Sequence, residues 1–116
     1  MVDLMLSFEV ISGLAIACPD GFTVDTKTLQ PVESGFAVAV AGTQNSFGNY
    51  GLAKVLAYIN KHPEVNAVGG WYNSDNKQYY FDATIIVNDL ETAIKLGREN
   101  KQIAIFDLNN MVEIRL

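Results

Sequence analysis

The fold is decided by residues 69–108, which read GGWYNSDNKQYYFDATIIVNDLETAIKLGRENKQIAIFDL. This stretch and the residues just before it predict two strands, over residues 67–72 and 78–87, joined by a loop over residues 73–76. Asn and Asp in the loop tolerate the left-handed backbone that hairpin turns require. In the second strand every other residue is apolar, the period of two that a half-buried strand shows. We therefore expect a β-hairpin here.

A helix and two further strands should follow the hairpin. Asn88 has the chemistry of a helix N-cap, and Glu91 stands three residues on, as in a capping box. Residues 103–108 form a short apolar run that predicts a strand, and residues 111–115 predict a last strand at the sheet edge.

A strand and a helix are also predicted before the hairpin. Residues 35–41 alternate larger apolar residues with alanines, so one face of this strand is small enough to let another group pack closely. The following helix carries one apolar stripe, formed by Leu52, Val55, Leu56 and Ile59. It should end near Lys61, because Pro63 disfavours the helical conformation just before it.

The N-terminal segment is more ambiguous. Residues 4–11 alternate in the manner of a strand, and we expect a buried strand pair within residues 1–18. An export signal is the competing interpretation, and Ala15-Ile16-Ala17-Cys18 resembles a lipoprotein cleavage site. A secretory signal needs a positively charged start, however, and this segment has no Lys or Arg.

The predicted elements define the fold class. From residue 35 to residue 108 their order is strand, helix, strand, strand, helix, strand, which is the split βαβ arrangement of ferredoxin-like domains. We expect an α+β protein with an antiparallel sheet and two helices on one face. Further strands should extend the sheet at both chain ends, one of them over residues 22–25, after a turn at residues 19–21.

Composition excludes several classes of protein. The chain has 116 residues, 49% apolar and 18% charged, which is typical of a single globular domain over residues 1–116. No apolar run is long enough to span a membrane. The net charge is -5 and the eight Lys and Arg residues are scattered, so nucleic-acid binding is not expected.

Reactive residues are few. Cys18 is the only cysteine, which excludes an internal disulfide and fits a cytoplasmic location. It lies among small apolar residues, typical of an inert thiol. His62, the only histidine, lies at a helix end, where we expect an exposed cap. These residues do not predict a catalytic triad, a zinc site or a cofactor.

Two sets of polar residues are candidates for a phosphate-binding or hydrolytic site. The first is the loop from Thr43 to Gly48, with Thr43, Gln44, Asn45 and Ser46 as candidate anion ligands before a helix. It lacks the Lys-Ser or Lys-Thr ending of a Walker loop, and Asn45 or Ser46 could instead be a helix N-cap. The second set is Asp82 and Asp107, which could converge if their strands are neighbours. Otherwise they are ordinary solvated or turn-stabilising acids.

The aromatic residues of the hairpin are candidates for a binding surface: Trp71, Tyr72, Tyr79 and Tyr80. They alternate between the two faces of the hairpin, so one set should belong to the core while the other faces outward. Exposed Tyr and Trp are enriched at protein interfaces. The competing interpretation is cross-strand packing that only stabilises the hairpin.

Five segments of the chain resemble a known group of proteins. They are GFTV (21–24), SGFAV (34–38), GGWY (69–72), DLETA (89–93) and GRENKQIAIFDL (97–108). Together they resemble small uncharacterised proteins carried by bacteriophages and other bacterial mobile elements, over residues 21–116. That group has no established activity, so the resemblance carries over no catalytic residue. It implies a small cytoplasmic accessory factor that acts on host or element proteins.

The sequence therefore favours a non-enzymatic module that uses a sheet face or an edge strand to bind a protein partner or itself. The alternative is a small hydrolase or nucleotide-binding protein built on the Thr43–Gly48 loop with Asp82 or Asp107.

Overall fold

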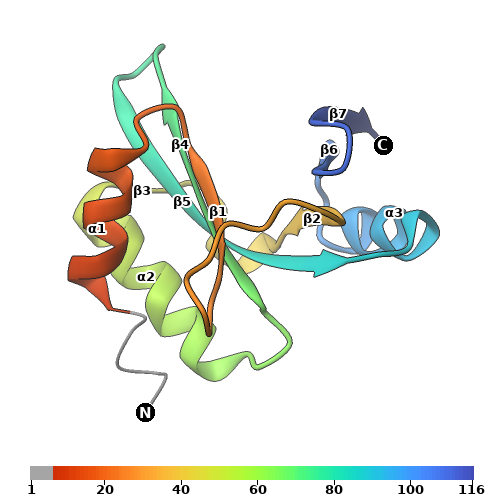
Figure 1. Ribbon diagram of the computed structural model, residues 1–116, viewed down its shortest axis with the longest axis horizontal. Helices are drawn as coiled ribbons and strands as arrows, with labels where there is room; N and C mark the ends of the chain where they lie inside the picture. Colours follow the sequence, from red (N-terminus) through yellow and green to blue (C-terminus); the bar gives the residue numbers. More distant parts are fainter. Residues whose placement is uncertain (1–6) are drawn as a thin grey trace.

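The structure is a computed structural model that describes residues 7–116, and it is an α+β fold with one twisted sheet and three α-helices (Figure 1). In chain order the elements are α1 (Phe8–Ala17), β1 (Phe22–Asp25), β2 (Phe36–Ala39), the short 3₁₀ helix η2 (Ala41–Thr43), β3 (Ser46–Phe47), α2 (Gly48–Lys61), β4 (Ala67–Asn73), β5 (Gln78–Val87), α3 (Leu90–Glu99), β6 (Ala104–Asp107) and β7 (Val112–Arg115).

All strand pairs are antiparallel, and six strands run in the order β1-β4-β5-β2-β6-β7. The seventh strand, β3, pairs with β5. In the unit β2–α2–β4 the two strands are not neighbours in the sheet, because β5 lies between them. In the unit β5–α3–β6 the two strands are likewise separated by β2. This is the predicted split βαβ arrangement. The strands β1 and β7 extend the sheet at its two edges, as expected.

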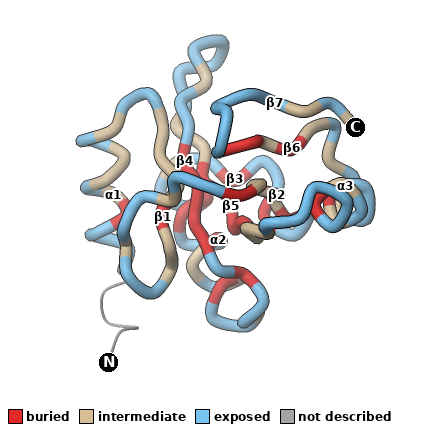
Figure 2. The backbone as a smooth tube through the Cα atoms, turned by 45° about the vertical axis from the view of Figure 1, so that its right-hand side comes forward, coloured by how far each residue is buried: buried red, intermediate tan, exposed pale blue. Residues whose placement is uncertain are grey.

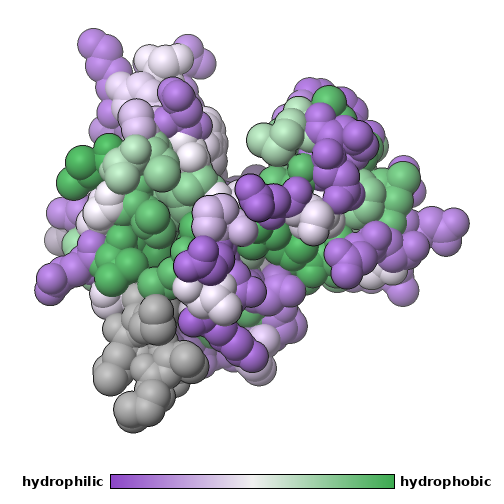
Figure 3. Space-filling model, viewed as in Figure 1, coloured by the Kyte–Doolittle hydropathy of each residue, from purple (hydrophilic) through white to green (hydrophobic). Residues whose placement is uncertain are grey.

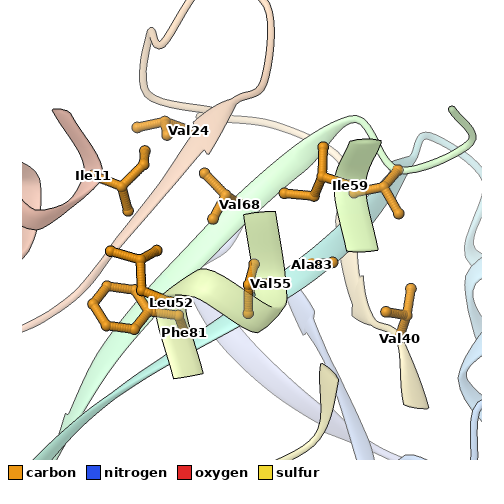
Figure 4. Close-up of a cluster of buried hydrophobic side chains, with 10 residues drawn as sticks. Ile11, Val24, Val40, Leu52, Val55, Ile59, Val68, Phe81 and Ala83 are labelled. Atoms are coloured by element: carbon orange, nitrogen blue, oxygen red, sulfur yellow. The ribbon is translucent and has the colours of Figure 1, made fainter. Parts of the chain in front are cut away.

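The helices all cover one face of the sheet. A larger core cluster joins α1 and α2 to the sheet, with Leu52 and Val55 of α2 packed against Val68 of β4 and Phe81 of β5 (Figure 4). A smaller cluster joins α3 to β2 and β6 through Ala93, Val38 and Ile105. Figure 2 shows that burial concentrates in the centre of the sheet, while the tip of the β4–β5 hairpin and β7 are exposed. None of the helices within residues 7–116 covers the opposite face of the sheet.

The strand predicted in the N-terminal segment is wrong over residues 8–17. Residues 8–17 form α1, and residues 1–6 lie outside the described residues. Ser7 caps the helix, since its Oγ accepts a hydrogen bond from the N–H of Val10 over 3.3 Å. Ile11 is fully buried, with Leu14 packed against the same cluster one turn later. Residues 8–17 form a helix because Ile11 and Leu14 then pack together against the apolar side of α2.

Two predicted helix caps differ in the structure: one is shifted by a residue and the other is absent. Helix α3 is capped by Asp89 instead of Asn88, because the Asp89 carboxylate accepts from the N–H of Thr92 over 2.9 Å. Helix α2 begins after Phe47 with no side-chain cap, so neither Asn45 nor Ser46 has that role. The predicted end of α2 at Lys61 is confirmed.

Candidate functional site

Strand register decides which face each hairpin aromatic occupies. Trp71 pairs with Tyr80 and Tyr72 pairs with Tyr79. Tyr79 lies on the helix side with Phe81, because residues two apart on a strand share a face. Trp71 and Tyr80 therefore lie on the helix-free face, which we call the open face. The predicted alternation of the aromatics is confirmed.

Three rings form a row across the open face, which we call the aromatic row: Phe47, Tyr80 and Trp71. The Tyr80 ring stacks on Trp71 at a centroid distance of 4.8 Å and contacts Phe47 at 5.2 Å. The Asn76 amide donates a hydrogen bond to the Tyr80 hydroxyl over 2.7 Å, which fixes that ring. Trp71 nonetheless keeps 45% of its surface exposed. The row is a rigid apolar surface that remains open to a partner.

Tyr79, in contrast, belongs to the fold. Its ring packs against Phe22 and Phe81, and its hydroxyl donates to the carbonyl oxygen of Cys18 over 2.7 Å. Burial, with the nearby Cys18 and Asp20, raises the pKa of Tyr79 to about 12. The hydroxyl therefore stays protonated and ties the end of α1 to the sheet. Tyr72 is 46% exposed but on the face opposite Trp71.

A hollow of about 450 Å³ lies beside the aromatic row on the open face. The side chains at its floor are small, since they are Ala37 and Ala39 of β2 and Ala104 of β6. The sequence predicted this small face for β2. In the space-filling view a notch separates the β4–β5 hairpin from the β6–β7 hairpin (Figure 3). The complete lining is Thr23, Ala37, Ala39, Trp71, Asp82, Thr84, Ala104, Ile105, Phe106 and Glu113.

Asp82 supplies the acid of this hollow. Its carboxylate accepts a hydrogen bond from the hydroxyl of Thr84, two residues along β5. The carboxylate lies over Gly69, since a Cβ on Gly69 would come within 2.8 Å of Asp82 Oδ1. Burial raises the pKa of Asp82, and the Thr84 hydrogen bond only partly opposes that effect. Asp82 is thus a poorly solvated acid, and a cation beside it would stabilise its charged form.

A second, more apolar groove of about 950 Å³ continues from the hollow. The two share Thr23, Ala37, Trp71 and Phe106. The acids that line them are Asp20, Glu33, Asp82 and Glu113, and among the described residues no Lys or Arg lines either one. The combined surface is therefore aromatic, apolar and acidic.

The Thr43–Gly48 loop does not line the hollow or the groove. Thr43 and Ser46 are buried, and their hydroxyls form hydrogen bonds in the connection between β2 and β3. Thr43 Oγ1 accepts from the N–H of Ala83 over 3.0 Å, and Ser46 Oγ donates to the Thr43 carbonyl over 2.7 Å. Gln44 and Asn45 are exposed. Anion binding at this loop stays a prediction, and the geometry gives its two hydroxyls a role in the fold.

Asp82 and Asp107 do not converge. β2 lies between their strands, and the register places Asp107 on the helix side of the sheet with Phe36. Hydrogen bonds from Asn110, first from its side chain, and from Asn109 lower the pKa of Asp107. This is the turn-stabilising role that the sequence offered as the competing interpretation.

His62 and Cys18 both lie at helix ends. His62 is the C-cap of α2, its ring stacks on Tyr58, and its Nδ1 lies 2.8 Å from the Tyr58 carbonyl oxygen. Cys18 is the partly buried C-cap of α1. Within residues 7–116 no three His, Cys, Asp or Glu side chains are grouped as metal ligands.

Comparison with known proteins gives no relative: no protein family, curated protein or solved structure matches this chain. The resemblance to phage and mobile-element proteins stays a prediction. Among the helices of the described residues, none is long and apolar enough to cross a membrane.

Proposed function

We propose that this protein is a non-enzymatic interaction module whose open face binds an extended segment of a protein partner. One observation carries the proposal. The aromatic row, with Trp71 half exposed, borders a hollow with an alanine floor on a sheet face that none of the three helices covers. A rigid aromatic beside a pocket is the arrangement in which interface residues contribute most binding energy.

The chemistry of the surface favours a polypeptide as the ligand. A phosphate backbone would be repelled by the acids of the hollow and groove, since neither contains a basic side chain among the described residues. A peptide can place apolar side chains against the aromatic row and fill the space above Ala37 and Ala39.

A library of random twelve-residue peptides, displayed and selected against the purified protein, tests this proposal. Selected peptides should bind wild type and should bind Trp71→Ala at least tenfold more weakly, a loss of about 1.4 kcal/mol. Tyr72→Ala is the matched control, because Tyr72 is as exposed as Trp71 but lies on the other face. Its affinity should stay within about twofold.

Three outcomes would contradict the proposal. They are the selection of no peptide above background, equal affinities for Trp71→Ala and wild type, and a larger loss with Tyr72→Ala. Circular dichroism of each variant establishes that it is folded. A concentration-dependent dimer that excludes the peptides would assign the open face to a second copy of this chain instead.

A further inference from the structure

We propose that the partner segment places an arginine side chain in the hollow, with its guanidinium stacked on Trp71 and its charge against Asp82. This inference rests on the proposed function, because it names the group that the open face recognises.

Charge complementarity is the first observation. The acids that line the hollow and the groove are Asp20, Glu33, Asp82 and Glu113, and no Lys or Arg of the described residues lines either one. Arg115, which pairs with Ala104, lies on the open face outside that lining. An acidic, partly apolar concavity attracts a cation that also carries apolar surface, and it discriminates against acidic partners.

The register supplies the geometry. Trp71 pairs with Tyr80 and Gly69 pairs with Asp82, so Trp71 and Asp82 are diagonal neighbours on the open face. Diagonal neighbours on antiparallel strands are separated by about 7–8 Å, a gap that one flat cation can span. Gly69 has no side chain, and the Asp82 carboxylate lies over it. The hollow, which Trp71 and Asp82 both line, therefore has an aromatic wall and an acid beside the free space.

One oxygen of Asp82 is available to a ligand. Oδ1 accepts from Thr84, and Oδ2 has no hydrogen-bond partner among the described residues. Every fully buried side-chain polar atom of residues 7–116 has a partner. Oδ2 is therefore not completely buried, and because Asp82 lines the hollow we infer that a donor reaches it from there.

Arginine fits this site better than lysine does. Tyr80 covers one face of the Trp71 ring, and Trp71 is still 45% exposed, which leaves ring surface for a ligand. The planar guanidinium stacks on such a ring and donates hydrogen bonds in its plane to a carboxylate. It also loses less hydration than an ammonium group does when it enters a narrow hollow.

The state of Asp82 in the free protein supports the same assignment. Burial raises the pKa of Asp82, so the charged form lacks solvation until a partner arrives. A guanidinium beside the carboxylate would lower that pKa again. Binding should therefore strengthen as pH rises from the acid range toward neutrality.

The test uses the peptides selected on the open face. For a selected peptide, each arginine is replaced in turn by citrulline, which keeps the shape of the side chain and removes its charge. One such replacement should lower the affinity for wild type about tenfold, and lysine at that position should restore only part of it. The Asp82→Asn variant should bind the arginine peptide about tenfold more weakly than wild type does. It should also bind the arginine and citrulline peptides with equal affinity. Glu91→Gln, at an exposed position in the first turn of α3 and away from the open face, should change affinity by less than about threefold.

The outcomes separate the two proposals. If affinity depends on Trp71 while citrulline replacement has no effect, the arginine inference is wrong and the proposed function stands. An arginine dependence that persists unchanged in Asp82→Asn would also overturn the inference, as would selected peptides that are enriched in Asp and Glu. If no selected peptide depends on Trp71, both proposals fail.

Discussion

Gly69 and Asp82 lie directly opposite each other on β4 and β5, and the Asp82 carboxylate occupies the space above Gly69. A side chain at position 69 would push the carboxylate out of the hollow. The neighbouring glycine, Gly70, faces the other side of the sheet, where the rings of Phe22 and Tyr79 lie against it. Two adjacent glycines thus have different roles: Gly69 makes room for the acid, and Gly70 makes room for the aromatic core.

The two glycines should respond differently to alanine. Gly70→Ala places a Cβ against the Phe22 ring, closer than van der Waals contact allows, so we expect a loss of roughly 1–3 kcal/mol in the free energy of unfolding. Gly69→Ala meets only the end of the Asp82 side chain, which can rotate, so its stability should fall by less than about 1 kcal/mol. Affinity for the selected peptides should nevertheless drop in Gly69→Ala. Urea unfolding and peptide titration of both variants check this, and equal stability losses would contradict the assignment.

Asp82 should make the protein less stable as pH rises. Its folded pKa lies above the ordinary value of 3.8, so its contribution is complete below that value and is lost as pH rises through the folded pKa. Asp82→Asn keeps an oxygen to accept from Thr84 and cannot ionise. The free energy of unfolding of the variant minus that of wild type should increase from pH 3.5 toward pH 7, on the basis of this linkage.

Urea unfolding across that range measures the difference. Asp89 and Asp107 have lowered pKa values and act in the opposite sense, but they are present in both proteins and cancel. Glu113 is the other titratable group of the hollow, and it too is common to both. A difference that is flat or decreases with pH would show that Asp82 is well solvated.

The N-terminal helix gives a test of the fold. A helix over Phe8–Ala17 buries Ile11, whereas in a strand over residues 4–11 Val10 would share the apolar face with Phe8 and Ile11 would lie on the other face. Ile11→Ala should cost roughly 2–5 kcal/mol, because Ile11 is fully buried. Val10→Ala should change stability by less than about 0.5 kcal/mol, because Val10 is 39% exposed. Thermal unfolding compares the two, and a larger cost for Val10→Ala would favour the strand.

Thr43 should matter for stability through its hydroxyl. Thr43→Val keeps the shape of the side chain but leaves the N–H of Ala83 without its partner inside the protein, at a cost of about 1–3 kcal/mol. Thr43→Ser keeps the acceptor and should lose clearly less. Chemical denaturation of both variants measures the hydroxyl contribution. Similar losses for valine and serine would mean that packing alone, and not the hydrogen bond, makes Thr43 important.

Much of the sheet was predictable because its signals are local. The bounds of β5 match the prediction at both ends, since alternation and the Asn-rich turn act over neighbouring residues. The same alternation implies that Tyr80, Asp82 and Thr84 share one face of β5, as they do in the structure. Helix α1 was missed because its apolar residues also fit an alternating pattern, and the packing of Ile11 on distant residues selects the helix.

The hollow was only partly predictable. The alanine face of β2 was visible in the sequence, but its neighbour in the hollow, Ala104, comes from β6. That proximity depends on strand order, which brings together residues more than 60 positions apart in the sequence. The position of Asp82 above Gly69 likewise depends on register between two strands. A single sequence contains no direct signal for such long-range pairings.

The most direct test of the binding face is an NMR titration of the ¹⁵N-labelled protein with a selected arginine-containing peptide. We expect the largest shifts at the Trp71 indole N–H and at the amides of Thr23, Asp82 and Thr84, with little change along α2 and α3. Shifts that instead concentrate on the helix-covered side, or on the Thr43–Gly48 loop, would contradict the assignment of the open face as the binding surface.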